Sequence, residues 1–299
     1  MAEPGARSGL LDPRTIRVLA DELNLHPSKQ RGQNFVIDPN TVRRIVALSG
    51  VQPGEVVLEV GPGLGSLTLG LLEAGALVTA VEIESSLATR LARTVSERLP
   101  DAADRLTVVE ADALRITELD PPPTRVVANL PYNISVPVIL HLLATFPSIT
   151  SGLVMVQLEV ADRLVAPPGS KVYGTPSAKL AWYASASRVG TVPATVFWPV
   201  PNVESGLVAF TRREAPSSVD RQTVFDVIDA AFGQRRKMLR AALSGVFGSS
   251  AAASDALEAA GIDPTLRGET LTIQQFAAIV NGDGGAGILG IACEYHCQQ

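Results

Sequence analysis

The stretch Glu59-Val60-Gly61-Pro62-Gly63-Leu64-Gly65 decides the fold of this 299-residue chain. It follows a short apolar run, Val56–Val60, and opens into a helical pattern over Leu67–Glu73. Alternating glycines allow a sharp turn and let a ligand approach the backbone closely. A strand, a glycine-rich turn and a helix in this order indicate an α/β sheet with a ligand site at its strand ends.

Apolar runs of strand length alternate with helical stretches from Val51 to about Val160, as is typical of buried parallel strands joined by crossover helices. The expected strands are Val56–Val60, Leu77–Ile83, Leu106–Glu110, Arg125–Asn129 and Gly152–Leu158. The expected helices between them are Leu67–Glu73, Ser86–Arg98 and Val136–Thr145. Two later β-like stretches, Ala184–Val192 and Val203–Thr211, are expected to add an antiparallel hairpin at one edge. The sequence therefore predicts a doubly wound, Rossmann-like α/β sheet.

A change in the sequence pattern after Glu214 predicts a second, all-helical domain. The turn-rich segment Ala215-Pro-Ser-Ser-Val-Asp220 is followed by helical patterns, which are Thr223–Phe232, Lys237–Leu243, Ser254–Ala260 and Ile273–Val280. We expect an N-terminal extension over residues 1–27, a sheet domain over 28–214, a helical domain over 215–281 and a flexible tail over 282–299.

Composition narrows the class of protein. The chain is 46% hydrophobic, no apolar run approaches the length of a membrane span, and the N-terminus has no secretory signal pattern. We therefore expect a soluble, cytoplasmic protein. Cys293, His296 and Cys297 offer three zinc ligands near the end of the chain, but no fourth lies nearby, so we expect no metal site.

A net charge of −5 disfavours a nucleic-acid partner, but local clustering of cations matters more than the sum. The segment Phe232–Arg240 carries four cations, among them Arg235, Arg236 and Lys237, and no acid. On its own, such a run indicates either a solvated helix face or a contact with phosphates.

The glycine loop favours a methyltransferase over a dehydrogenase. A nicotinamide-binding loop would place its third glycine at position 66, where this chain has Ser66. Glu82 ends the second strand, where a carboxylate can accept both ribose hydroxyls of an adenosine-containing ligand, and both enzyme classes use this contact. Asp112 follows the third strand and can accept from an adenine amine or cap a turn.

The tetrapeptide Asn129-Leu130-Pro131-Tyr132 at the end of the fourth strand is the most specific motif. An adenine N6 lone pair is delocalised into the ring, so N6 is a poor nucleophile until acceptors hold its N–H groups. The Asn129 amide oxygen and the Leu130 carbonyl can be those acceptors, while Pro131 stiffens the loop and Tyr132 stacks on the base. The motif predicts transfer of a methyl group to an adenine amine.

Taken together, these motifs resemble the ribosomal RNA adenine dimethyltransferases of the kasugamycin-sensitivity type. The resemblance runs from roughly Ser28 to Ile279. The segments that carry it are Lys29–Val36, Leu58–Thr68, Val81-Glu82, Ala111-Asp112, Asn129–Tyr132, Met155–Arg163, Tyr173-Gly174, Phe197–Pro201 and Phe232–Lys237.

The resemblance implies a methyltransferase sheet with a small helical C-terminal domain, and S-adenosylmethionine as cofactor. It implies dimethylation of two adjacent adenines near the 3′ end of 16S RNA, in the 30S subunit or its precursor, by a monomer. Phe197 would stack on the target base opposite Tyr132, and Arg235, Arg236 and Lys237 would contact RNA. The implied cofactor contacts are Asn34, Val36, Gly61, Gly63, Glu82, Asp112 and Asn129.

The chain departs from the family pattern at two places. Arg31 stands where many relatives have an aromatic residue before Gly32, and the tail after Asn281 does not match the family.

Three competing functions stay open. A large-subunit RNA methyltransferase conferring macrolide resistance would share the loop and a related tetrapeptide, although the helical domain and Phe197–Pro201 favour the small-subunit type. A ribosome-assembly or RNA-binding factor with a vestigial pocket is the second competing function, and a dehydrogenase is the third.

Overall fold

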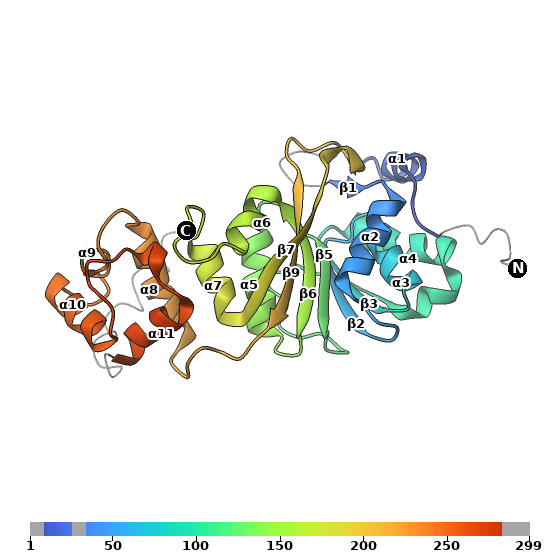
Figure 1. Ribbon diagram of the computed structural model, residues 1–299. Coiled ribbons are helices and arrows are strands. Elements are labelled where there is room, and N and C mark those ends of the chain that lie inside the picture. Colours follow the sequence, from blue (N-terminus) through green and yellow to red (C-terminus); the bar gives the residue numbers. More distant parts are fainter. Residues whose placement is uncertain (1–8, 26–33, 283–299) are drawn as a thin grey trace, which may run out of the picture. The chain divides into compact units, whose positions relative to one another are not determined.

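The computed structural model describes residues 9–25 and 34–282, which form two compact units (Figure 1). The first unit comprises the chain up to Asp162 together with Ala186–Arg212, and the second comprises Arg163–Ser185 and the chain from Arg213 onward. The division expected at 214 assigned residues 163–185 to the sheet domain, whereas they belong to the helical unit. Their helix packs on helices of that unit, and the Tyr173 hydroxyl donates to the Leu271 carbonyl over 2.8 Å.

A seven-stranded sheet in the order β4-β3-β2-β5-β6-β9-β7 organises the first unit. The first five of these strands are mutually parallel, and β9 runs antiparallel to β6. The expected doubly wound sheet is confirmed, and chain order reverses between β2 and β5, which creates a crevice at the strand ends. The strands are β2 (Val56–Val60), β3 (Leu77–Glu82), β4 (Leu106–Glu110), β5 (Arg125–Asn129), β6 (Ser151–Gln157), β7 (Ala184–Val192) and β9 (Ser205–Arg212).

Helices flank this sheet, and a separate two-stranded pair lies apart from it (Figure 1). The helices are α1 (Pro13–Glu22), α2 (Pro39–Ser49), α3 (Ser66–Glu73), α4 (Ser85–Arg98), α5 (Ser135–Thr145) and α6 (Leu158–Leu164), with the 3-10 turns η2 (Pro100–Arg105) and η3 (Ala194–Val196). The small pair joins β1 (Phe35–Val36) to β8 (Phe197–Trp198) in antiparallel register. In the part of the chain that the structure describes, no helix has the length and apolar character of a membrane span.

The second unit is helical, as the sequence predicts. Its elements are α7 (Thr175–Tyr183), α8 (Arg221–Gly233), α9 (Leu239–Ala242), α10 (Ser250–Ala259), α11 (Ile273–Gly282) and the 3-10 turn η4 (Gly268–Thr270). Aromatic rings pack at its centre, where Phe232 meets Tyr173 edge-on at 5.7 Å and lies 6.2 Å from Phe276. Such pairs stabilise the unit beyond the apolar area that they remove from water.

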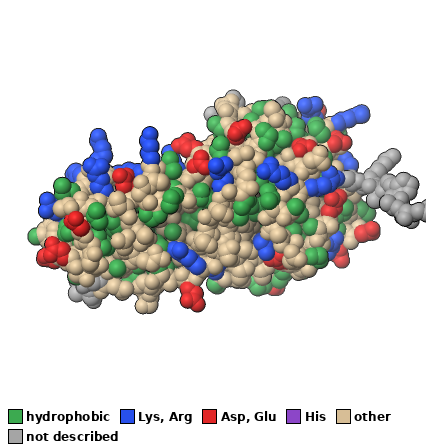
Figure 2. All heavy atoms as spheres, viewed as in Figure 1, with side chains coloured by type: hydrophobic (Ala, Val, Ile, Leu, Met, Phe, Trp, Pro, Cys, Tyr) green, Lys and Arg blue, Asp and Glu red, His purple; other side chains and the backbone are tan. Residues whose placement is uncertain are grey.

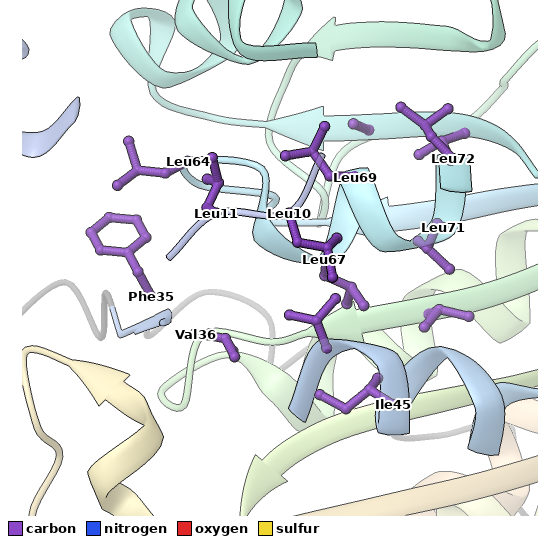
Figure 3. Packing of buried hydrophobic residues seen from close by; sticks show 14 of the residues in the cluster. Leu10, Leu11, Phe35, Val36, Ile45, Leu64, Leu67, Leu69, Leu71 and Leu72 are labelled. Atoms are coloured by element: carbon purple, nitrogen blue, oxygen red, sulfur yellow. The ribbon is translucent and has the colours of Figure 1, made fainter. Parts of the chain in front are cut away.

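The sequence predicts an N-terminal extension over residues 1–27. In the structure, the described part of this segment, residues 9–25, contributes side chains to the core of the first unit. Asp12 caps α1 by accepting from the Thr15 amide over 2.7 Å, and Pro13 occupies the first helical turn. The Gly9 amide donates to the Glu73 carboxylate over 2.9 Å. Figure 3 shows Leu10 and Leu11 among the leucines of α3, and both belong to the buried cluster of this unit.

Some expectations concern residues outside the described part. The zinc-ligand candidates Cys293, His296 and Cys297 lie there, as does Arg31 of the segment Lys29–Val36, which we call the arm. Within residues 9–25 and 34–282, no three His, Cys, Asp or Glu side chains group as a metal site would require.

Truncation of a buried α1 side chain should destabilise the whole first unit. Ile16 is 0% exposed and Val18 on the same helix is 48% exposed. We expect Ile16→Ala to lower the free energy of unfolding by about 2–5 kcal/mol, because it removes packed methyl groups and leaves a cavity. The control Val18→Ala should change it by less than about 0.5 kcal/mol. Urea denaturation followed by circular dichroism measures both, and equal effects would show that α1 does not belong to the core.

Candidate functional site

The glycine loop between β2 and α3 has a backbone that only glycine adopts readily. Gly61, Gly63 and Gly65 have φ angles of 67°, 56° and 96°. A Cβ atom at Gly63 would lie 2.7 Å from the Phe35 ring, which extends from β1 (Figure 3). The Gly61 amide donates to the Val81 carbonyl over 2.9 Å, so the loop is fixed to β3. This loop forms the floor of a cavity at the strand ends.

Glu82 ends β3 and faces the same cavity. Its carboxylate accepts from the Gly63 amide over 3.2 Å and from the Glu84 amide over 3.1 Å. Burial raises the pKa of Glu82, while these backbone hydrogen bonds oppose the shift. The carboxylate therefore joins the glycine loop to β3 and keeps further lone pairs for a ligand.

A second carboxylate, Glu59, lies in the interior behind the loop. It accepts from the Thr68 hydroxyl over 2.6 Å. Burial raises the pKa of Glu59 to about 8; the Thr68 hydrogen bond lowers it, and the neighbouring Glu82 charge raises it. Near neutral pH Glu59 is therefore mostly protonated, and a cationic ligand in the cavity would favour its charged form.

The cavity encloses about 490 Å³ beside the point where strand order reverses. Three carboxylates line it, and no Lys or Arg occurs among the described residues that do so. The lining residues are Asn34, Phe35, Val36, Glu59, Gly61, Pro62, Gly63, Leu64, Ser66, Leu67, Glu82, Ile83, Glu84, Leu87, Asn129, Pro131, Asn133 and Ile134. The charged groups of this lining therefore favour a cationic ligand over an anionic one.

The tetrapeptide loop 129–132 is anchored at three points. The side-chain Nδ2 of Asn129 donates to the Asn34 carbonyl over 3.0 Å. The Oδ1 atom of the same side chain remains as its acceptor. The Leu130 amide donates to the Met155 carbonyl of β6 over 3.1 Å. The Tyr132 hydroxyl lies 2.8 Å from the Ser205 hydroxyl at the start of β9.

Seven predicted residues line the cavity together: Asn34, Val36, Gly61, Gly63, Glu82, Asn129 and Pro131. Leu130, Tyr132, Asp112 and Phe197 are not among the lining residues. Leu130 is buried, whereas Tyr132 is half-buried one residue beyond Pro131.

Asp112 and Phe197 have structural roles in this arrangement. Asp112 follows the end of β4 by two residues and accepts from the Leu114 amide over 2.9 Å, which is the turn-capping role that the sequence allowed. Phe197 is 0% exposed and pairs with Val36 in the β1–β8 pair. Their contacts with an adenine remain predictions.

Comparison with known proteins identifies the family. The family model "Ribosomal RNA adenine dimethylase" matches residues 24–282. This chain belongs to that family. The Ribosomal RNA small subunit methyltransferase A of Cutibacterium acnes is 60% identical, with 95% of this chain and 98% of that protein covered. The protein of the same name from Thermobifida fusca is 61% identical, with 92% and 96% covered.

Solved structures bear out the fold. A dimethyladenosine transferase from Plasmodium falciparum matches with a TM-score of 0.72 and 23% identity, covering 84% of this chain and 98% of that one. The 23S rRNA methyltransferase ErmE matches with a TM-score of 0.61 and 25% identity, covering 83% and 99%.

Eleven of the lining residues were not predicted as site residues, among them Phe35, Ser66, Ile83 and Asn133. The Phe35 ring fills the space beside Gly63, and the Ser66 hydroxyl donates to the Val36 carbonyl over 2.7 Å, so Ser66 ties the arm to α3. Ile83 is 70% exposed although apolar, and it follows the strand-end acid directly. Asn133 follows the tetrapeptide. For Ile83 alone a signal existed, because an apolar residue after Glu82 at a ligand-binding edge is placed to cover a ring.

The basic run lies on the second unit, where three segments meet. Arg235 pairs with Glu269 at 2.7 Å and donates to the Lys171 carbonyl over 2.8 Å, so it holds these segments together. Arg236 and Lys237 are exposed beside them. Figure 2 shows Lys and Arg side chains standing out from this unit, at the left of the view. We define the basic surface as Lys171, Arg236, Lys237, Arg240 and Arg267, all exposed.

Buried Glu59 should make stability depend on pH. Its pKa rises from 4.5 to about 8 on folding, so between these values the native state binds a proton that the unfolded chain lacks. The free energy of unfolding should therefore fall with rising pH in this interval, by up to about 1.4 kcal/mol per unit, and stay level outside it. Glu59→Gln removes this pH dependence. The free energy of unfolding of the variant, relative to that of the natural protein, should therefore increase as the pH rises through this interval. Denaturation curves measure the difference, and parallel pH profiles would contradict the assignment.

Proposed function

We propose that this chain transfers methyl groups from S-adenosylmethionine to N6 of two adjacent adenosines near the 3′ end of 16S rRNA, giving N6,N6-dimethyladenosines. The proposal is carried by the Asn129 side chain, which lines the cavity and is fixed by its hydrogen bond to the Asn34 carbonyl. Within the described chain, the only charged residues that line this cavity are carboxylates. The small-subunit relatives at about 60% identity support the choice of RNA.

The cavity residues fit S-adenosylmethionine, which carries a sulfonium and an ammonium group. Glu82 and Glu84 supply complementary charge, and the bound cation would favour the charged form of the neighbouring Glu59. Glu82 would accept the ribose hydroxyls, and Gly61 and Gly63 allow the close backbone approach. Asn34, Val36 and Asp112 would complete the contacts, with Asp112 accepting from the adenine amine. When bound, the cofactor supplies an electrophilic methyl group.

The tetrapeptide prepares the attacking amine. The Asn129 Oδ1 atom and the Leu130 carbonyl would accept the two N6 hydrogens, which favours a tetrahedral nitrogen with its lone pair free to attack. Tyr132 would stack on one face of a base held out of its helix, with Phe197 as the second aromatic. Pro131 stiffens the backbone between the two acceptors and the ring. A strong general base is not required, since the amine becomes acidic as the methyl group arrives.

The RNA contact is proposed for the second unit. Exposed Arg236 and Lys237 can neutralise phosphates, and Arg235 positions them by bridging Glu269 and the Lys171 carbonyl. Clustering of these cations offsets a net charge of −5. We also propose the 30S subunit or its precursor as the substrate, the cytoplasm as the compartment and a monomer as the active form.

Glu82→Ala should weaken cofactor binding. Losing a hydrogen-bonded charge costs about 1.5–3 kcal/mol, which corresponds to a roughly ten- to hundredfold higher Kd. The matched control is Glu110→Ala, because Glu110 ends the neighbouring strand opposite Glu82 but does not line the cavity. Calorimetric titration with S-adenosylmethionine measures both variants, and an unchanged Kd for Glu82→Ala would show that the pocket is misassigned.

Asn129→Ala should lose turnover and weaken cofactor binding much less than Glu82→Ala does, because the side chain's acceptor acts on the amine that attacks. The measurement is transfer of labelled methyl groups to isolated small subunits, with mass spectrometry of the 16S RNA to locate the product. Full activity of Asn129→Ala would remove the role of the tetrapeptide.

The same preparation tests the competing functions. Primer extension on both ribosomal RNAs separates a small-subunit enzyme from one that modifies 23S RNA, as ErmE is named for. Tight subunit binding without any methyl transfer would instead favour an assembly factor.

A further inference from the structure

The Ser205 hydroxyl lies 2.8 Å from the Tyr132 hydroxyl, although 73 positions separate the two residues in the chain. We infer that Ser205 is a positioning residue, which holds the Tyr132 ring in the place where it receives the target base. This inference rests on the proposed function, in which Tyr132 stacks on the adenine.

Ser205 is a rigid support for such a contact. Its side chain is 0% exposed, and it is the first residue of β9, directly opposite Gln157 at the end of β6. The Leu158 amide donates to the Glu204 carbonyl over 3.0 Å, which fixes the backbone just before it. At the next residue, Gly206, a Cβ atom would clash with that of Ala161, so β9 lies tight against α6. Ser205 therefore has little freedom to move.

The Tyr132 ring is held at both of its ends. On the backbone side, the Leu130 amide is bound to the Met155 carbonyl, two residues before the ring. On the far side, the hydroxyl meets Ser205. The tyrosine hydroxyl oxygen lies on the axis about which the ring turns, so a tether at this atom restricts χ1 and thereby fixes where the ring lies. Without the Ser205 partner, the side chain would move between χ1 rotamers and occupy the position beside the base for part of the time only.

The contact also connects the two aromatic segments of the site. Ser205 ends the stretch that begins at Phe197, and Phe197 is itself paired with Val36 of the arm. The segment 197–205 therefore contains Phe197 and also holds Tyr132 through the Ser205 hydroxyl. A change in the position of this segment would move both aromatics together.

The experiment compares the natural protein with Ser205→Ala, Tyr132→Phe and the double variant. Each single variant removes the same hydrogen bond, and we expect each to lower kcat by about tenfold with the KM and Kd for S-adenosylmethionine unchanged. The double variant should be no slower than either single one, because the second change removes nothing further. A small-subunit RNA with 2-aminopurine at the target adenine should show weaker fluorescence quenching with Ser205→Ala, since the base stacks less.

The matched control is Ser49→Ala, which removes another buried hydroxyl of the first unit, bound to the Val46 carbonyl over 2.6 Å. It should leave kcat and quenching unchanged. Natural turnover by Ser205→Ala, or single effects that multiply to about a hundredfold in the double variant, would overturn the inference alone. Absence of methyl transfer by the natural protein would overturn the proposed function as well. If Ser205→Ala does not fold, Tyr132→Phe decides, because it removes the bond without disturbing the packing at Ser205.

Discussion

The site depends on the immobility of the loop 129–132, which is hydrogen-bonded to three other segments of the first unit. Asn34 belongs to the arm, Met155 to β6 and Ser205 to β9. A methyl transfer to an amine that is a poor nucleophile needs its acceptors within a few tenths of an ångström of their place. A strand end and a short turn could not supply this alone. The neighbouring elements supply it by binding the loop from both sides.

A second constraint on the cavity is the burial of two carboxyl groups close together. Burying Glu59 and Glu82 near one another is unfavourable, and hydrogen bonds from Thr68 and from the Gly63 and Glu84 amides offset part of the cost. A cationic ligand would offset more of it. The same acidity would repel an anionic group placed beside Glu82 and Glu84.

The sheet could be predicted from the sequence because its strands are buried apolar runs with clear ends; β2, β4 and β5 have the expected bounds. The strand-end residues Glu82 and Asn129 followed from the rule that ligands bind there. Helix α1 was missed, since a short helix that supplies only a few core side chains resembles an extension. The contact between Tyr132 and Ser205 could not be predicted, because no local pattern records a pairing across 73 positions. For Asp112, the sequence allowed two roles, and the structure shows the cap.

The reversed direction of β9 explains how segments so far apart meet at one edge. Strands β2 to β6 run parallel, so their carboxyl ends define the ligand-binding edge. Because β9 is antiparallel to β6, it is the beginning of β9 that lies at this edge, opposite Gln157. The chain just before it contains Phe197, which pairs with the lining residue Val36. A parallel strand in this position would place Ser205 at the opposite edge, and Tyr132 would have no such partner. The antiparallel direction of β9 is thus what brings the Ser205 hydroxyl to Tyr132.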